Sequence, residues 1–371
     1  MKRLLLAALY LFIVASCGKQ DNIKTLLNNS NKNEVEYAQN IKIFKEKYHT
    51  EIQIINPEKN SIEKRIICFS NKQYLPKREG NVIYIQTPVK GIVCLSSTHI
   101  GMLNKINALS FVKGIDNPNY IDNKYILSKV KRHKMSILGS IETINPERIL
   151  NTQANIIMYS GFGKALANED KLQKLHITAV ANYDWKEINP LGKAEWIKIF
   201  GVLTNQSKEA ETYFNKIKNE YIKLKYQAKK LTKSNQLLAG SMIGDSWYMP
   251  AGDSYLAEIF RDAKIDYVAK ETKGIGSYSV SLEKSIRNYH NATYWINPGA
   301  QNKKELLSFN KRYSYFKAYK ENKLFCYSHN PNFYWENSAI EPQKLLNDLI
   351  IISHSDEYSG KLYFYKKIKN E

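Results

Sequence analysis

Short apolar runs separated by polar breaks dominate residues 38–88. Each run is brief, some alternate with polar residues, and Asn, Pro, Lys or Gly ends each one. This pattern is typical of short β-strands joined by turns. We therefore expect a small antiparallel β-rich unit that packs on the next domain, with strands at 41–44, 50–55, 65–69 and 82–85.

From Gly91 onward, apolar runs alternate with helical patterns. Strands are expected at 92–95, 111–115, 155–159 and 177–181, and helices at 99–106 and 164–175. A further helix begins at 145–147, because Pro146 suits the first turn and Glu147 suits the positive end of a helix. Strands that alternate with helices favour a mainly parallel sheet.

Residues 207–231 carry one continuous helical stripe. Apolar residues recur at steps of three and four from Ala210 to Leu231, which is the spacing of one helix face. Ser207 suits the N-cap position, and at 1.5 Å per residue the helix would be about 37 Å long. A long surface helix would show the same pattern, but its position between two α/β halves favours a bridge.

After this stripe the α/β rhythm resumes, with strands at 236–240 and 294–296 and helices at 254–263 and 342–352. The two halves share a weak repeat. In each half an acid, Glu147 or Glu283, stands at the start of a helix that is followed by a buried strand. We expect a β-rich addition at 38–88, a first lobe at 89–206, a bridging helix at 207–232 and a second lobe at 233–371.

The N-terminus resembles a secretory signal. Lys2 and Arg3 precede an apolar run from Leu4 to Val14, which is shorter than the ~20 residues needed to span a bilayer. Cys17 follows Ala15 and Ser16, as in the bacterial lipobox, where cleavage before the cysteine precedes its acylation. An ordinary signal peptide with a chance cysteine is the alternative. We expect residues 1–16 to be removed, Cys17 to be lipidated, and polar residues 17–37 to form a flexible tether.

The amino-acid composition is that of an ordinary globular protein with an excess of basic residues. The hydrophobic content is 43%, and the net charge is +20, or +18 without Lys2 and Arg3. The lysines are spread along the chain, and no basic-aromatic motif indicates nucleic-acid binding. Besides Cys17 only Cys68, Cys94 and Cys326 are present. We expect these three cysteines to be buried free thiols, with one disulfide between two of them as the alternative. No C-x-x-C metal pair occurs.

Several motifs together resemble the periplasmic binding proteins for iron chelates and cobalamin. They are the runs 91–99, 112–115, 138–139 and 145–150, followed by the bridging helix, and the resemblance covers about 88–355. The β-rich segment, the run 192–198 and Tyr334-Trp335-Glu336 are similar to a lipoprotein subgroup of Bacteroidetes type. The resemblance implies an α/β fold of class III, with two Rossmann-like lobes joined by one long rigid helix and a small N-terminal β-rich addition.

The resemblance also implies docking on the permease of an ABC importer through one acid on each lobe. By position Glu147 and Glu283 match those acids. An alternative is that both acids only complement helix N-termini, a contribution of about 0.3–1 kcal/mol each. An exposed acid at each lobe tip would serve both purposes.

Ligands of open α/β sheets meet the loops at the carboxyl ends of strands. Aromatic side chains there suit a bulky, partly apolar ligand. The residues that we expect to bind ligand are Ser97, Thr98, His99, Tyr159, Phe162, Tyr183, Trp185, Asp245, Trp247, Tyr248, Asn297, His329, Tyr334 and Trp335.

Other function classes fit less well. Gly244-Asp245-Ser246 is similar to the nucleophile block of one esterase family, but the following Leu and a late Asp-x-x-His are absent. Neither G-x-S-x-G nor H-E-x-x-H occurs, so an enzyme is not expected. A metal-ion receptor using His99 and His329 lacks orderly ligand spacing. A purely structural surface lipoprotein would need no paired lobes.

We therefore expect a monomeric binding protein, lipid-anchored in the cell envelope and facing the periplasm. Its ligand would be an iron chelate, either a ferric siderophore or haem, with cobalamin as the alternative. No cofactor of its own and no resident metal are expected. The basic chain favours an anionic chelate, although charges beyond about 8 Å are screened at physiological salt.

Overall fold

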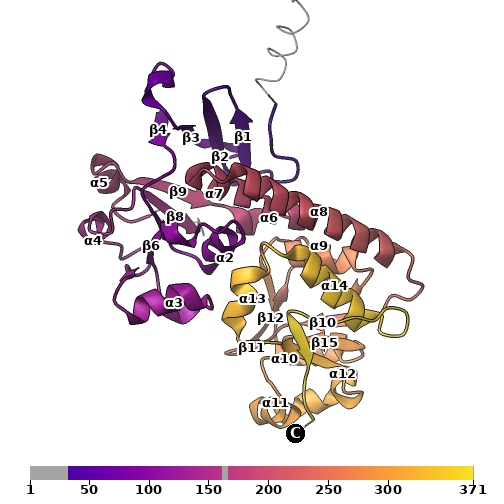
Figure 1. Cartoon of the computed structure of the whole chain (residues 1–371). Coiled ribbons are helices and arrows are strands. Elements are labelled where there is room, and N and C mark those ends of the chain that lie inside the picture. Colours follow the sequence, from indigo (N-terminus) through magenta and orange to yellow (C-terminus); the bar gives the residue numbers. More distant parts are fainter. Residues whose placement is uncertain (1–31, 161–165, 371) are drawn as a thin grey trace, which may run out of the picture.

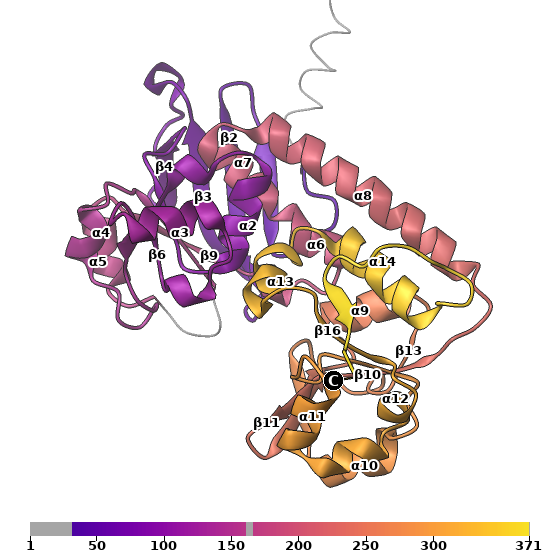
Figure 2. The ribbon, with the colours of Figure 1, turned by 60° about the horizontal axis from the view of Figure 1, so that its bottom comes forward.

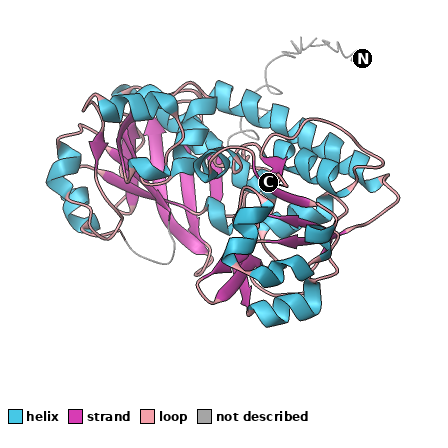
Figure 3. Ribbon diagram, turned by 90° about the horizontal axis from the view of Figure 1, so that it is seen from below, coloured by secondary structure: helices cyan, strands magenta, loops and turns pink. Residues whose placement is uncertain are grey.

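The computed structural model of the chain describes residues 32–160 and 166–370. An N-terminal sheet and two α/β lobes follow one another, and one long helix runs along both lobes (Figure 1). The view in Figure 3 shows the strands of both lobes lying among helices. Within the described ranges no helix is both long and apolar enough to cross a membrane.

The β-rich segment forms a four-stranded sheet of order β1-β2-β3-β4. Its strands are β1 (Ile41–Lys45), β2 (His49–Asn56), β3 (Ser61–Phe69) and β4 (Val82–Gln86). The expected strands are all present, but the expected antiparallel pairing is wrong for one pair, because β3 and β4 run parallel. Residues 70–81 carry the chain back to the starting end of the sheet, and such a return is what parallel pairing requires.

The start of the described chain is bound both to the N-terminal sheet and to the first lobe. Glu34 N–H donates to the Ile43 carbonyl at 2.8 Å, and the Glu195 carboxylate accepts from the N–H groups of Glu36, Tyr37 and Ala38. Residues 34–37 therefore belong to the body of the protein, which corrects the expected tether boundary at residue 37. Their backbone polar groups are satisfied by a buried partner rather than by water.

Lobe 1 is built on a parallel sheet of order β7-β6-β5-β8-β9. Its strands β5 and β8 are buried along their whole length because helices cover both faces of the sheet. The strands are β5 (Ile92–Cys94), β6 (Val112–Ile115), β7 (Ser136–Ile137), β8 (Ile156–Ser160) and β9 (Thr178–Asn182). The helices are α2 (Ser97–Lys105), α3 (Lys124–Lys131), α4 (Pro146–Leu150), α5 (Glu169–Lys174), α6 (Pro190–Glu195) and α7 (Ile197–Thr204), with short 3-10 turns η2 (Leu109–Phe111), η3 (Pro118–Tyr120) and η4 (Asp184–Lys186).

Helix α8 (Ser207–Lys229) follows lobe 1 directly and leads into lobe 2 (Figure 2). Its 23 residues span about 34 Å. The predicted stripe is buried at Ala210, Phe214, Ile217, Tyr221 and Ala228. It packs on α7 of lobe 1 and on α14 of lobe 2. One helix thus contributes to the packing of both lobes.

Lobe 2 contains a five-stranded sheet of order β13-β10-β15-β16-β17, in which only β17 is antiparallel, and an antiparallel sheet β11-β12-β14. The strands are β10 (Gln236–Ala239), β11 (Ser241–Ile243), β12 (Ser246–Pro250), β13 (Asp266–Tyr267), β14 (Ser277–Val280), β15 (Tyr294–Ile296), β16 (Leu324–Tyr327) and β17 (Tyr365–Lys367). The helices are α9 (Tyr255–Asp262), α10 (Leu282–Tyr289), α11 (Lys303–Phe309), α12 (Lys317–Lys320), α13 (Pro331–Asn337) and α14 (Pro342–Ser353), with η5 (Lys311–Tyr315). The second sheet was not expected from the sequence.

Candidate functional site at the boundary between the lobes

Helix α13 of lobe 2 packs on helix α2 of lobe 1 (Figure 1). The buried Glu336 carboxylate on α13 accepts hydrogen bonds from the backbone N–H groups of Asp122 and Asn123, at 2.9 and 3.0 Å. A carboxylate of lobe 2 thus binds the backbone just before helix α3 of lobe 1. Gly101 on α2 permits the close approach, because a Cβ there would lie 1.9 Å from the Glu336 carbonyl oxygen.

The loop after β16 and the first turn of α13 also reach lobe 1. Asn330 Nδ2 donates to Asp122 Oδ1 at 2.9 Å, and Asn332 Nδ2 donates to the Asn119 carbonyl at 2.7 Å. The carboxyl end of β16 therefore lies at the boundary between the lobes. This is the position at which open α/β sheets present ligand-binding loops.

A second contact between the lobes is made by Lys193 of α6 and Tyr255 of α9. The Lys193 ammonium lies 4.8 Å from the centre of the Tyr255 ring and 3.9 Å from Asp184 Oδ1. Lys193 and Asp184 are both buried. Burial raises the pKa of Asp184, and the nearby Lys193 charge counters only part of that effect. The two residues place one buried cation and one buried acid beside lobe 2.

Tyrosines crowd the facing part of lobe 2. The ring centres of Tyr327 and Tyr334 are 4.6 Å apart, and Tyr365 lies 6.0 and 6.2 Å from these two rings. Asn297 Nδ2 donates to the Tyr365 hydroxyl at 3.4 Å. Burial raises the pKa of all three phenols, so their hydroxyl groups stay protonated and can donate hydrogen bonds.

The structure separates the residues predicted on lobe 1. Ser97 and Thr98 begin α2 and are half-buried, as is Trp185 on η4. His99 is fully buried against Phe200, with ring centres 5.8 Å apart, and burial lowers its pKa to about 3. The prediction of His99 as an accessible ligand contact is wrong, because its helix turns that side chain into the core.

The two tyrosines predicted on lobe 1 face elsewhere. Tyr159 and Tyr183 are buried, and the Tyr183 hydroxyl donates to Glu63 of the N-terminal sheet at 2.6 Å. Tyr183 therefore attaches the β-rich unit to lobe 1, instead of projecting toward lobe 2 as predicted. Phe162 lies outside the described residues.

On lobe 2 the predicted residues divide by exposure. Asp245 and Tyr248 are exposed on the β11–β12 hairpin, whereas Trp247 is fully buried and its indole donates to the Ala239 carbonyl at 3.0 Å. Neighbouring strand residues point to opposite faces, so Trp247 joins the core cluster around Trp295. Tyr334 is also buried, whereas Trp335 is 53% exposed. Trp247 and Tyr334 were wrongly predicted as exposed ligand contacts.

His329 is exposed beside the inter-lobe contact, and its hydrogen bonds define its tautomer. The Ser328 hydroxyl donates to the Tyr363 carbonyl at 2.6 Å, so its single proton is committed there. Ser328 Oγ lies 2.9 Å from His329 Nδ1 and must accept from it. In the neutral ring Nε2 is then unprotonated and has a free lone pair. This nitrogen could ligate a metal carried by a ligand.

The two matched acids occupy equivalent positions. Glu147 and Glu283 are each the second residue of a helix, α4 and α10, and both are exposed. The N-caps Asn145 and Ser281 hold the first turns. They differ in surroundings, because Glu283 pairs with Arg312 at 2.9 Å whereas Glu147 forms no ion pair with any described residue. A hydrogen bond from its own backbone N–H and the pairing with Arg312 lower the pKa of Glu283.

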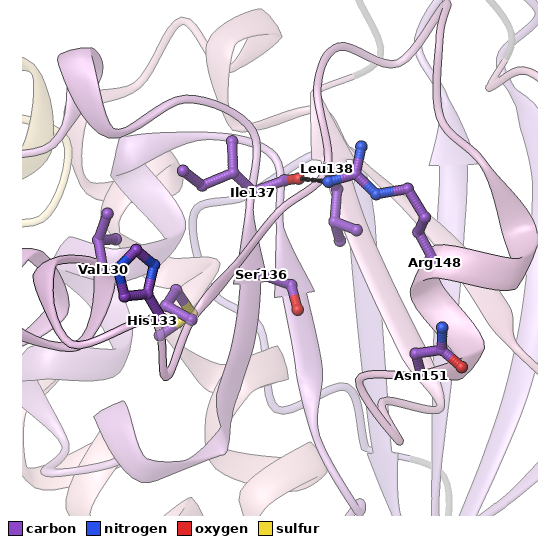
Figure 4. A pocket seen from close by; sticks show the side chains of 8 residues that line it. Val130, His133, Ser136, Ile137, Leu138, Arg148 and Asn151 are labelled. Atoms are coloured by element: carbon purple, nitrogen blue, oxygen red, sulfur yellow. Dashed lines mark hydrogen bonds between the residues drawn. The ribbon is translucent and has the colours of Figure 1, made fainter.

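One pocket of about 380 Å³ is lined by Arg148 and Asn151, at the end of helix α4 and just after it (Figure 4). It opens between β7 and α4, where Arg148 donates to the Ile137 carbonyl at 2.6 Å. His133 and Val130 line its other side. All the lining residues belong to lobe 1, so the pocket is not part of the boundary between the lobes.

Three residues at the contact between the lobes were not predicted as site residues: Lys193, Tyr255 and Glu336. Lys193 lies in the run 192–198 and Glu336 in Tyr334-Trp335-Glu336, both of which carried the family resemblance, so a signal was present for these two. Tyr255 had no such signal.

Cys68, Cys94 and Cys326 are buried free thiols. The described residues contain no group of three or more His, Cys, Asp or Glu that could hold a metal ion.

Two α/β lobes that meet at strand-end loops, with one helix along both, define a two-lobe binding protein. A family model described as periplasmic binding protein matches residues 92–330. The chain belongs to this family, whose members are transport binding proteins and not enzymes.

Known proteins resemble this chain in sequence or in fold. An uncharacterized lipoprotein of Methanocaldococcus jannaschii is 29% identical over 313 residues, covering 80% of this chain and 72% of that protein. A periplasmic haem-binding protein of Pseudomonas aeruginosa has a TM-score of 0.60 at 12% identity, covering 76% of this chain and 99% of that one. The periplasmic vitamin B12-binding protein of Vibrio cholerae has a TM-score of 0.54 at 10% identity, covering 73% and 99%. These two structures share the fold.

Proposed function

We propose that this chain is the substrate-binding lipoprotein of an ABC importer and captures an iron chelate between its lobes. The ligand is a ferric siderophore or haem, which the protein delivers to the permease. Structural neighbours include proteins that bind haem and vitamin B12. The lobes at 89–206 and 233–371 hold the ligand, and the helix at 207–232 acts as a rigid bridge that allows only slight closure.

The observation that favours haem among these ligands is the free Nε2 of His329 at the inter-lobe boundary. A neutral imidazole with its other nitrogen hydrogen-bonded is a suitable axial ligand for iron. The exposed indole of Trp335 suits a ligand with an aromatic ring system. Lys193 adds a positive charge at the boundary, which favours an anionic chelate.

Location and docking complete the proposal. Lipidation at Cys17 anchors the protein in the cell envelope, facing the periplasm, in line with the lipoprotein names of relatives. Glu147 and Glu283 dock on basic residues of the permease. The protein acts as a monomer and resembles the Bacteroidetes lipoprotein subgroup.

Titration with haem, a ferric siderophore and cobalamin tests the ligand class. The correct ligand should quench tryptophan fluorescence saturably, and Trp335→Phe should remove part of the quenching. Trp247→Phe is the matched control, because the buried Trp247 ring should lose no ligand contact. Quenching by cobalamin with no response to either iron chelate would reverse the choice. No response to any of the three would reject the binding site.

A further inference from the structure

A second pocket, of about 500 Å³, lies between α8 and α14. Its lining includes Lys223, Lys344 and Lys361 but only one acid, Glu220. Its wall contains Gln343, which is 4% exposed and whose Oε1 has no hydrogen-bond partner among the described residues. A buried amide oxygen without a partner is costly unless a ligand or water donates to it. The pocket is therefore suited to an anion that also carries a hydrogen-bond donor.

Two of the three lysines are available to such an anion. Lys344 pairs with Glu341 at 2.6 Å and lies over the Tyr363 ring at 3.8 Å. Lys223 and Lys361 are exposed and form no ion pair within the described part of the chain. A phosphate on a polyol has the required chemistry, because the phosphate meets the lysines and a hydroxyl can donate to Gln343.

The outer face of α8 beside this pocket carries exposed apolar groups. Ile222 and Tyr226, one turn apart, are 47% and 62% exposed. Lys230 lies 4.4 Å from the Tyr226 ring centre, and Lys229 is on the same side of the helix. Exposed apolar and aromatic groups among lysines are the pattern of a helix that lies on an anionic membrane surface.

The beginning of the described chain is bound along the same helix. Glu36 pairs with Lys218 of α8 at 3.0 Å, and Lys198 donates to the Glu34 carbonyl at 2.6 Å. Cys17 lies 15 residues before residue 32, and such a segment spans at most about 50 Å. A lipid on Cys17 would thus keep this side of the molecule near a bilayer.

We infer that the outer face of α8 and the pocket beside it bind an anionic phospholipid surface, with one phosphate headgroup in the pocket. The inference uses one part of the proposed function, the lipid anchor at Cys17, which would keep the protein close to the membrane. Helices α4 and α10, which carry Glu147 and Glu283, lie away from α8 (Figures 1 and 2). A molecule on the membrane therefore holds its docking acids away from the lipid, so membrane contact and permease docking are alternative orientations.

Sedimentation with vesicles tests the inference on the mature chain carrying Cys17→Ser, which has no lipid of its own. The protein should bind vesicles of phosphatidylcholine with phosphatidylglycerol and not phosphatidylcholine alone. Lys223→Gln with Lys361→Gln should weaken binding about tenfold or more, and Ile222→Ser with Tyr226→Ser should weaken it as well. Lys171→Gln with Lys174→Gln, exposed lysines of α5, is the charge-matched control and should change little.

Inorganic phosphate separates a free anion from a headgroup. Phosphate should raise the melting temperature of the unmodified chain and not of the Lys223/Lys361 variant. A response to phosphate without vesicle binding would show a site for a free anion and overturn the membrane inference. Equal losses in the α5 control would assign binding to general basic charge and overturn it too. Ligand titrations at the inter-lobe site should be unchanged in every variant, so failure there concerns the proposed function alone.

Discussion

The Glu195 carboxylate accepts a 2.7 Å hydrogen bond from the backbone N–H of Tyr37, 158 residues earlier in the chain. The same fully buried carboxylate accepts from the N–H groups of Glu36 and Ala38 and from Lys198. Glu187 binds the next two residues, Gln39 and Asn40, in the same way. Two acids of lobe 1 thus hold the strand-entry segment of the N-terminal sheet.

Glu195→Gln should lower the free energy of unfolding by about 2–4 kcal/mol, because an amide presents one acceptor where the carboxylate presents two. Urea unfolding measures the change. Glu271→Gln, at an exposed position, should shift stability by less than about 0.5 kcal/mol. Equal small effects of both substitutions would show that the segment is held by apolar packing.

Periodicity made several elements predictable. Helix α8, strands β5, β6, β8 and β9 of lobe 1 and strands β10 and β15 of lobe 2 follow directly from spacing in the sequence. The short strands β7, β13, β16 and β17 were not predicted, and the observed helix α8 ends three residues before the predicted end of the bridge at 232. The second sheet of lobe 2 was missed because β11 and β12 are short and carry mixed polar and apolar residues.

The side chains of the site were hard to predict from the sequence. The loop after β16 does reach the other lobe, but Trp247 and Tyr248 differ only in which face of β12 they occupy, and one residue of register decides it. The roles of Glu195 and Glu336 depend on backbone N–H groups more than 150 residues away. Spacing along the chain contains no information on such partners.

Cys17→Ser should abolish incorporation of a clickable fatty acid, because the cysteine thiol and its new amino group are the acylated positions of a lipobox. Metabolic labelling in the native host measures it. Cys68→Ser is a suitable control, since its thiol is buried and burial raises its pKa to about 12. Labelling that persists without Cys17 would leave an ordinary signal peptide as the correct interpretation.

Glu147→Lys combined with Glu283→Lys should abolish uptake while ligand affinity stays unchanged, because both acids are exposed and away from the inter-lobe contacts. Transport assays and titration of the purified protein separate the two effects. Each substitution also removes an acid from a helix N-terminus, which slightly lowers the stability of that helix. Glu209→Lys in the first turn of α8 matches that loss. Normal uptake by the double variant would rule out the docking assignment.

His329→Ala should weaken haem binding about tenfold or more and alter the haem absorption band, because the variant lacks the free Nε2 ligand. Binding of a ferric siderophore, whose iron is already coordinated, should change little. His176→Asn is the control, because His176 is exposed on lobe 1 and Asn tolerates its φ of 57°. An unchanged haem spectrum in His329→Ala would mean that another group, or none, ligates the iron.

Asp184 should make stability depend on pH in the direction set by its burial. Its pKa is raised in the folded protein, mainly because the carboxyl is buried, whereas in the unfolded chain it is near the ordinary value of about 3.9. Between the unfolded and the folded pKa, the unfolded chain has released the proton that the folded protein still binds. The contribution of Asp184 to stability is therefore fully present below about pH 4 and is lost as pH rises through the folded pKa.

Asp184→Asn keeps the shape of the side chain and removes its titration. Urea unfolding of both proteins between about pH 4 and 7 should show that the wild type loses stability relative to the variant as pH rises. The comparison cancels the other buried acids, Glu187 and Glu336, whose pKa values are also raised by burial. A difference that stays constant across this range, or grows in favour of the wild type, would show that Lys193 at 3.9 Å outweighs burial and keeps the carboxylate ionised in the folded protein.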